Sequence, residues 1–189
     1  MTGKELYTTV AQMGFARTLE DNEPYFYRAA NLSLSRIARR FPRISLYSLP
    51  VVDGKRSADF DLAELVSDFS GFPREVLFGE DVRPVEGRDF RVEGSRIILA
   101  RGLAGAFTVR YLHRPRQLSV DCLDEELDVA PYAESLLAPL VASYLWLDDR
   151  GELATHYLSL YHTEAEELSR CLNRHGGASI LIRNGWDKG

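Results

Sequence analysis

Four arginines near the end of a predicted second helix have the spacing of a binding face. They are three, one and three residues apart, which places them on one side of an α-helix. Guanidinium groups in a row can hold DNA phosphates or the carboxylates of a partner protein, because each presents a fork of N–H donors. An ordinary solvated helix face is the alternative, and both stay open. The residues are Arg36, Arg39, Arg40 and Arg43.

The histidines, cysteines and clustered acids do not have metal-site spacing. His156 and His162 are six residues apart, about 240° around a helix, so they do not share a ligand. Cys122 and Cys171 match no zinc or redox motif. The acidic run 121–128 lacks the glycine of a calcium loop, and a solvated loop before a helix explains it. We predict no metal and no cofactor, with the histidines at the surface or the edge of the core.

The sequence also lacks a recognisable catalytic set. The tripeptide His175-Gly176-Gly177 is similar to an oxyanion loop, but no G-x-S-x-G nucleophile elbow accompanies it. Its glycines more simply end the preceding helix. No phosphate-binding glycine motif is present either. We therefore predict a protein that is not an enzyme.

Composition predicts one structural domain in a reducing cytoplasm. The 189 residues carry a formal net charge of −5 and are 45% hydrophobic, which is typical of a globular protein. This charge excludes nucleic-acid binding over the whole surface and leaves a local basic patch possible. No apolar run is long enough for a membrane span, and the N-terminus has no signal-like apolar region.

The order of hydrophobic patterns predicts an α+β fold. Two helix pairs form a small antiparallel bundle that carries an inserted β lobe and an extended C-terminal arm. The predicted segments are an N-terminal helix pair at 1–43, a β lobe at 44–118, a C-terminal helical hairpin closing the bundle at 119–174, and the arm at 175–189.

The N-terminal pair begins with a capping box, Thr2 with Glu5 three residues later. The second helix ends at Pro42, which cannot continue it. Its apolar stripe follows helical spacing and comprises Phe26, Ala30, Leu34, Ile37 and Phe41.

Alternating patterns in the β lobe predict strands at 44–49 and 107–113, with Phe107, Val109 and Tyr111 facing one way. A hairpin with its turn at 93–95 joins strands at 89–92 and 96–100. The stretch 59–66 fits either a strand or a helix, and we favour a strand followed by a loop through Gly71 and Pro73. A short strand is predicted at 75–78.

The C-terminal hairpin, Pro131–Leu172, is the most regular stretch of the sequence. Its two helices flank an acidic turn at 148–151. Pro139 cannot donate a hydrogen bond to Ser135, so it is expected to kink or delay the first helix. That helix places five residues on one apolar face: Leu137, Leu140, Val141, Tyr144 and Leu145.

The C-terminal arm is apolar and aromatic after a glycine break, so we expect it to pack on another surface. It either folds back as an edge strand on its own β lobe or adds to a partner, where a tryptophan is a typical anchor. The candidate partner-binding residues are Ile180, Leu181, Ile182, Arg183, Asn184 and Trp186.

Taken in order, these patterns resemble the head–tail connector (adaptor, head-completion) proteins of tailed bacteriophages. The resemblance covers most of the chain and includes no catalytic residue. Its stretches are NLSLSRIARRFP, DFDLAEL, DFRVEGSRIILA, a strand ending in YLHRP, an acidic loop, and LVASYLWLDDRGELATHYLSLY before the tail.

The resemblance implies a structural virion protein in the neck, between the capsid portal and the tail. Copies of such proteins form a ring, usually dodecameric, under the portal vertex, and DNA passes through its lumen. The C-terminal arm, here 178–186, engages the portal protein, while the ring is a platform for the tail or the next neck protein. The alternative function is a cellular DNA-associated or scaffold module that uses the arginine face.

Overall fold

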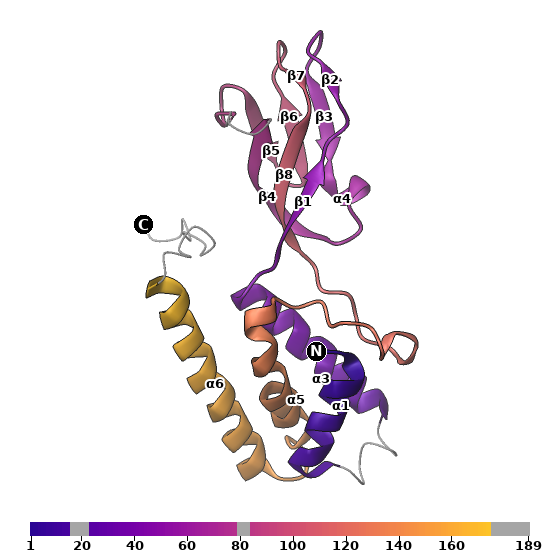
Figure 1. Cartoon of the computed structure of the whole chain (residues 1–189), viewed down its shortest axis with the longest axis vertical. Helices are drawn as coiled ribbons and strands as arrows, with labels where there is room; N and C mark the ends of the chain where they lie inside the picture. The colour runs from indigo at the N-terminus through magenta and orange to yellow at the C-terminus, as the bar shows by residue number, and fades with distance from the viewer. Residues whose placement is uncertain (16–22, 79–83, 175–189) are drawn as a thin grey trace. The chain divides into compact units, whose positions relative to one another are not determined.

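The computed structural model describes residues 1–15, 23–78 and 84–174, and the chain has an α+β fold. The long helices and the antiparallel strands occupy separate parts of the chain (Figure 1). None of the described helices combines the length and apolar character that a membrane crossing requires.

The chain forms two compact units. The helical unit contains the described residues of 1–37, residues 117–127, and those from 131 onward. The β unit contains 38–116 and 128–130. This division differs from the predicted segments, since the last residues of the second helix and a short piece of the acidic run cluster with the β unit.

The first helix, α1 (Gly3–Val10), starts with the predicted capping box. The hydroxyl of Thr2 accepts a hydrogen bond from the Glu5 N–H at 3.1 Å, and the Glu5 carboxylate accepts one from the Thr2 N–H at 2.8 Å. Two donors that a helix start leaves unpaired are thereby satisfied. The next turn is π-helical, η1 (Ala11–Phe15), and Gly14 within it has a φ of 104°, which glycine adopts without strain.

The long helix α3 (Glu23–Arg40) buries four residues of the predicted apolar stripe, and the fifth, Phe41, is buried directly after the helix ends. It ends two residues before Pro42, as the sequence predicts. Tyr7 of α1 meets Phe26 of α3 edge to face, with 5.2 Å between ring centroids. This contact attaches α1 to the buried side of α3.

The hairpin comprises a 3₁₀ segment η3 (Pro131–Leu136), α5 (Leu137–Leu145) and α6 (Gly151–Arg174). Pro139 delays the first α-helix as predicted. It lies in the first turn of α5, where N–H groups have no intrahelical acceptor, so its missing donor costs little.

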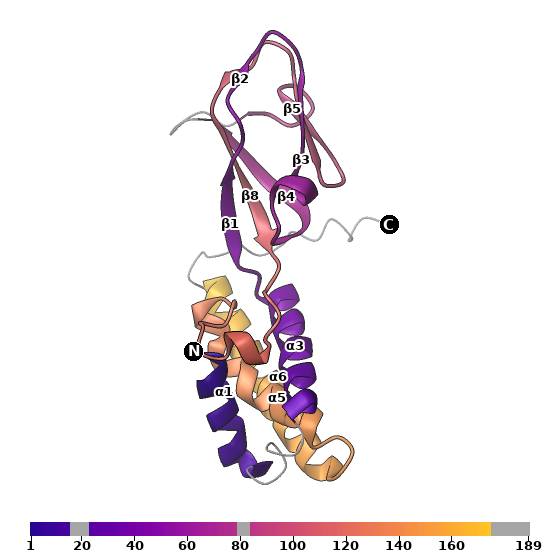
Figure 2. The ribbon, with the colours of Figure 1, turned by 90° about the vertical axis from the view of Figure 1, so that its right-hand side faces the viewer.

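α5 is the central helix of its unit, because it packs against both α1 and α6 (Figures 1 and 2). The predicted one-sided burial of this helix is wrong. Every residue from Leu136 to Ser143 is buried, including the small residues that lie off the apolar stripe. A helix that is apolar around its whole circumference is expected at the centre of a core.

The described part of the β unit contains three small antiparallel sheets (Figure 1). The first has the order β1-β8-β4, the second β3-β6-β5, and the third pairs β2 with β7. The strands are β1 (Ile44–Ser48), β2 (Val52–Asp53), β3 (Ala58–Asp61), β4 (Phe69–Phe78), β5 (Phe90–Glu93), β6 (Arg96–Leu99), β7 (Ala104–Gly105) and β8 (Phe107–His113).

The predicted hairpin and the predicted alternation of β8 are both confirmed. Gly94 has a φ of 65° in the turn between β5 and β6. Phe107, Val109 and Tyr111 are buried on one side of β8. They belong to a core that also contains Leu62 and Leu99, drawn from the other sheet and its neighbouring helix.

Two predictions in the β lobe are wrong in part. β4 is longer than the predicted strand, and its register with β8 shifts on both sides of Pro73, which has no N–H for the ladder. The strand predicted over 59–66 ends at Asp61, where β3 gives way to a short helix α4 (Leu62–Leu65), and the loop predicted through Gly71 and Pro73 is part of β4. The carboxylate of Asp61 accepts the Ala63 N–H at 2.9 Å and so caps this helix.

Residues 118–127 pack against the start of α1. Lys4 donates its backbone N–H to the Leu123 carbonyl at 2.9 Å, and Leu127 donates to the Met1 carbonyl at 2.9 Å. A Cβ atom on Gly3 would lie 2.6 Å from the Leu118 side chain and 3.1 Å from the Leu123 carbonyl oxygen. Gly3 therefore permits the close approach of the two segments.

Replacing Gly3 by valine is expected to destabilise the helical unit by about 1–2 kcal/mol, because the side chain forces the two segments apart. Urea unfolding followed by far-UV circular dichroism measures the loss. Gly151→Val is the matched control, since Gly151 also begins a helix and a Cβ there meets nothing within 4 Å. Equal effects of the two substitutions would contradict the packing argument.

Candidate functional site

The β unit gathers charged side chains at one end of the β1-β8-β4 sheet. Arg43 directly precedes β1, Asp68 directly precedes β4, and His113 ends β8. Because β1 and β4 both run antiparallel to β8, the starts of these strands meet its end. Asp128 reaches the same place from the short segment 128–130. These four residues are called the ionic cluster below.

His113 is at the centre of the ionic cluster, with a side chain only 9% exposed. Its Nδ1 lies 2.7 Å from Oδ2 of Asp68, and its Nε2 contacts Oδ2 of Asp128 on the opposite side of the ring. An ionised carboxylate only accepts hydrogen bonds. Both contacts are therefore hydrogen bonds when both ring nitrogens carry protons, and the imidazolium then bridges two carboxylates.

Tyr111 completes the surroundings of Asp68. Its hydroxyl donates to Oδ1 of Asp68 at 2.8 Å, which leaves Oδ2 for His113. Burial raises the pKa of Tyr111, and the hydrogen bond to Asp68 raises it further, so the hydroxyl keeps its proton and remains a donor.

Asp128 is the most heavily bonded member of the ionic cluster. Arg43 donates to its Oδ1 at 2.7 Å, and the Arg116 backbone N–H donates to its Oδ2 at 3.2 Å. Burial alone raises the pKa of Asp128. The hydrogen bonds from His113 and Arg116, with the charges of His113 and Arg43, outweigh burial and hold this pKa below its ordinary value. These contacts fasten segment 128–130 to the β unit.

Ser45 lies near the ionic cluster without forming a catalytic triad. Its Oγ is 3.5 Å from Nδ1 of His113, a long contact, whereas Asp68 occupies the same nitrogen at 2.7 Å. A general base needs a ring lone pair directed at the serine hydroxyl. Here a carboxylate faces each ring nitrogen, so neither presents a lone pair to Ser45.

The cluster does not have the geometry of a metal site. Asp68 and Asp128 lie against opposite ring nitrogens of His113, so the three groups do not converge on one point. Within residues 1–15, 23–78 and 84–174, no group of three or more histidine, cysteine or acidic side chains is placed to hold an ion.

The predicted arginine face is divided by the structure. α3 ends at Arg40, so the prediction that Arg43 shares its helix face is wrong. Arg43 instead belongs to the ionic cluster. Arg36 donates to the Tyr144 hydroxyl at 3.2 Å and stacks over the Tyr161 ring at 5.4 Å. Arg40 lies over the ring of the residue that follows it, and Arg39 is exposed.

The acidic run 121–128 is not a solvated loop throughout, so that interpretation is wrong for Asp128. The others remain at the surface. Asp124 pairs with Lys4 at 3.6 Å, with both side chains largely exposed, and Glu126 forms an isolated β-bridge with Thr2.

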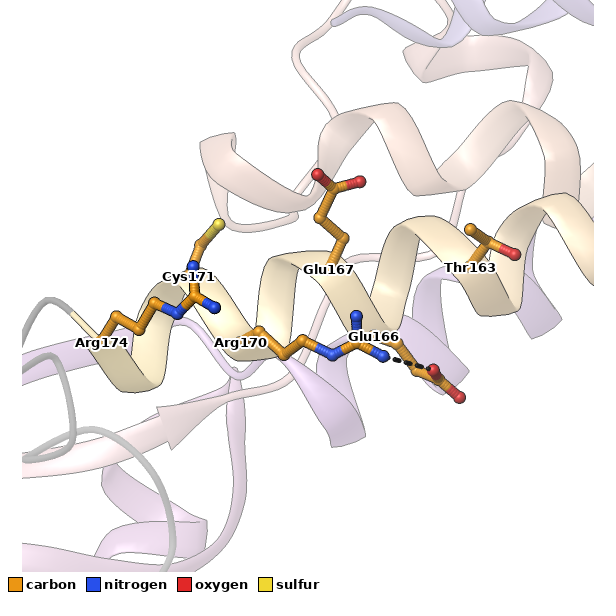
Figure 3. Close-up of a pocket in the computed structure, with 6 residues that line it drawn as sticks. All are labelled: Thr163, Glu166, Glu167, Arg170, Cys171 and Arg174. Carbon is orange, nitrogen blue, oxygen red and sulfur yellow. Dashed lines mark hydrogen bonds and ion pairs between the residues drawn. The ribbon is translucent and has the colours of Figure 1, made fainter.

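The C-terminal residues predicted to bind a partner lie outside the described part of the chain. The helix before them has a hollow of about 390 Å³ along its last turns (Figure 3). All six lining residues belong to α6, and two of them, Glu166 and Arg170, form an ion pair at 3.3 Å. A ligand site usually needs side chains from more than one element, so this hollow does not form a binding site.

Comparison with known proteins leaves the chain without an assigned family. No protein-family model matches it, and no curated protein matches it at a significant level.

Sequence reasoning missed Asp68, His113 and Asp128 as a group. One signal was present. His113 is two residues after Tyr111, so it lies on the same face of β8 as Phe107, Val109 and Tyr111. A titratable residue on a buried face needs a polar partner. The pattern therefore indicates a buried pair, but it does not identify the two acids.

Proposed function

We propose that the chain is a structural virion protein, a head–tail connector that links the capsid to the tail. In this proposal, copies assemble as a ring on the portal vertex, and DNA passes through the lumen. The portal protein and the tail or next neck protein are the partners. The protein acts in the neck of the virion by binding rather than by catalysis.

The observation that supports this proposal most is where the resembling stretches fall. NLSLSRIARRFP covers the second half of α3, and LVASYLWLDDRGELATHYLSLY covers most of α5, the turn and the first half of α6. Most of both stretches therefore lies in the helical unit, although residues 38–42 belong to the β unit. The charged groups of the ionic cluster bind one another, so the cluster fastens the fold and does not count against a role in binding rather than catalysis.

The test uses particles that carry a portal but lack this chain. Wild-type protein is expected to add a ring of density below the portal in electron micrographs. A chain ending at Gly177 is expected to remain folded by circular dichroism but to lose binding, because Ile180–Trp186 are assigned to the portal contact. A full-length chain with residues 178–186 in scrambled order is the matched control, and it should also fail to bind.

Two outcomes would contradict the proposal at different levels. Portal binding by the shortened chain would remove the assigned role of the arm and leave the connector function intact. No ring with the wild-type chain would remove the connector function itself.

The alternative, a DNA-associated or scaffold module, has less support. It requires a continuous arginine face, whereas Arg43 belongs to the ionic cluster and Arg36 contacts two tyrosines. Arg39 favours it, because it is exposed. Salt-dependent binding of duplex DNA by the free chain, lost in an Arg39→Glu, Arg40→Glu variant, would support this alternative over the connector.

A further inference from the structure

The outward side of α3 combines exposed apolar and cationic residues. Tyr25, Arg28, Leu32 and Arg36 are spaced three, four and four residues apart, so they share one side of the helix. Tyr25 is 62% exposed and Leu32 is 50% exposed. This set of four residues is called the α3 face.

The positive charge of the α3 face meets no carboxylate among the described residues. The described partners of Arg36 are the hydroxyl of Tyr144 and the ring of Tyr161, which are both uncharged. In the part of the chain that the structure describes, Arg28 makes no ion pair. An apolar surface with uncompensated cations is suited to an apolar, acidic counterpart.

Such a counterpart exists in the same unit, on residues 119–126, called the acidic segment. It carries four carboxylates, and Val120 among them is 62% exposed. Lys4 pairs with one of these carboxylates, and that ion pair is largely solvated. Asp121, like Arg28, has no ion pair among the described residues. The carboxylates are Asp121, Asp124, Glu125 and Glu126.

The acidic segment is anchored beside α3 through Leu118, the residue that precedes it. Asn31 binds the backbone of Leu118 twice, donating to its carbonyl at 3.0 Å and accepting from its N–H at 2.6 Å. Burial raises the pKa of Tyr27 on α3, and the carboxylates of Glu23 and Asp121 raise it further. Because the backbone is already ordered, a partner that binds the segment loses little additional conformational entropy.

We propose that the α3 face of one copy of this chain binds the acidic segment of a second copy. Each copy presents both surfaces, side by side, so the contact can be made reciprocally and the two surfaces are mutually complementary in charge and in apolar character. The proposal concerns free copies of the chain and goes beyond the portal-binding function, which can fail or hold independently.

Charge-reversal variants test the contact between copies. Sedimentation velocity of the full chain at low salt is expected to show self-association that weakens as salt increases. Arg28→Glu and Asp121→Arg are each expected to weaken it at least about tenfold, since each places like charges opposite one another. An equimolar mixture of the two variants should restore association. In a mixed pair the introduced carboxylate meets the introduced guanidinium, and the wild-type charges still face each other at the reciprocal contact.

The equimolar mixture of the two variants distinguishes the loss of a specific contact from a defect in folding. Both positions are exposed, so each variant should keep the circular dichroism spectrum and melting temperature of the wild type. A wild-type chain that stays monomeric at every concentration, or variants that associate as well as the wild type, would overturn the proposal. It would also be overturned if the mixture stays monomeric, or if the α3 face binds duplex DNA instead of a second copy.

Discussion

Replacing Asp128 by asparagine is expected to lower the stability of the β unit by about 2–3 kcal/mol. The carboxylate accepts hydrogen bonds from Arg43, His113 and the Arg116 backbone. Asparagine has nearly the same shape but no charge, and its NH₂ group faces donors. His113, which is almost fully buried, then loses one of its two carboxylate partners. A buried polar group that loses its partner retains its desolvation cost.

The pH dependence of this effect has a definite sign. The folded state lowers the pKa of Asp128 below its ordinary value. Ionised Asp128 therefore stabilises the folded state fully above the unfolded pKa, about 4, and this contribution disappears as pH falls through the folded pKa. We expect the difference in unfolding free energy between wild type and Asp128→Asn to decrease as the pH falls below about 4.

Hydrogen exchange read by mass spectrometry locates the loss. Peptides that cover β1 and β8 should exchange faster in Asp128→Asn, because segment 128–130 no longer holds that end of the sheet. Peptides from α6, in the other unit, should not change. Asp124→Asn is the control, since its ion pair is solvent-exposed and is expected to contribute less than about 1 kcal/mol. Faster exchange spread over both units would contradict a local role for the ionic cluster.

Local patterns in the sequence were sufficient for the elements with one buried face. The capping box at Thr2, the stripe of α3 and the alternation of β8 each depend on residues that are close in sequence. α5 was predicted less well, because Ala138, Ala142 and Ser143 give no hydrophobic signal of their own. Their burial depends on the two helices that pack around α5, which local periodicity does not reveal.

Local sequence patterns could not predict the ionic cluster, for a related reason. Asp68 and Asp128 lie 45 and 15 residues from His113 in the sequence. Asp68 meets it because the strand register brings the start of β4 to the end of β8, and Asp128 meets it from the separate segment 128–130. The acidic run is uniform in sequence, yet Asp128 is partly buried in the β unit and the other acids are at the surface. Local sequence does not identify which acid is buried.

Replacing Tyr161 by alanine is expected to produce the largest loss in the helical unit, about 4 kcal/mol. Tyr161 is 1% exposed and is the largest fully buried side chain among the described residues. Its removal leaves a cavity on the buried side of α6. Tyr161→Phe keeps the ring and should cost about 1 kcal/mol or less, the usual value of a hydrogen-bonding hydroxyl.

Urea unfolding followed at 222 nm, where helices dominate the circular dichroism, measures these losses. Tyr25→Ala is the matched control, because the same truncation at an exposed position leaves no cavity. A Tyr161→Ala loss no greater than that of Tyr25→Ala would contradict the central position of this ring.

Tyr161 also contacts Arg36, so the contributions of the two residues to the unfolding free energy should be coupled. The Arg36 guanidinium lies 5.4 Å from the ring centroid and donates to Tyr144 beside it. Its hydrogen bond to Tyr144 is the main reason that the pKa of Arg36 is raised. Arg36→Ala should therefore cost about 0.5–1 kcal/mol less in the Tyr161→Ala background than in the wild type. No coupling would mean that the Tyr144 hydroxyl alone holds Arg36.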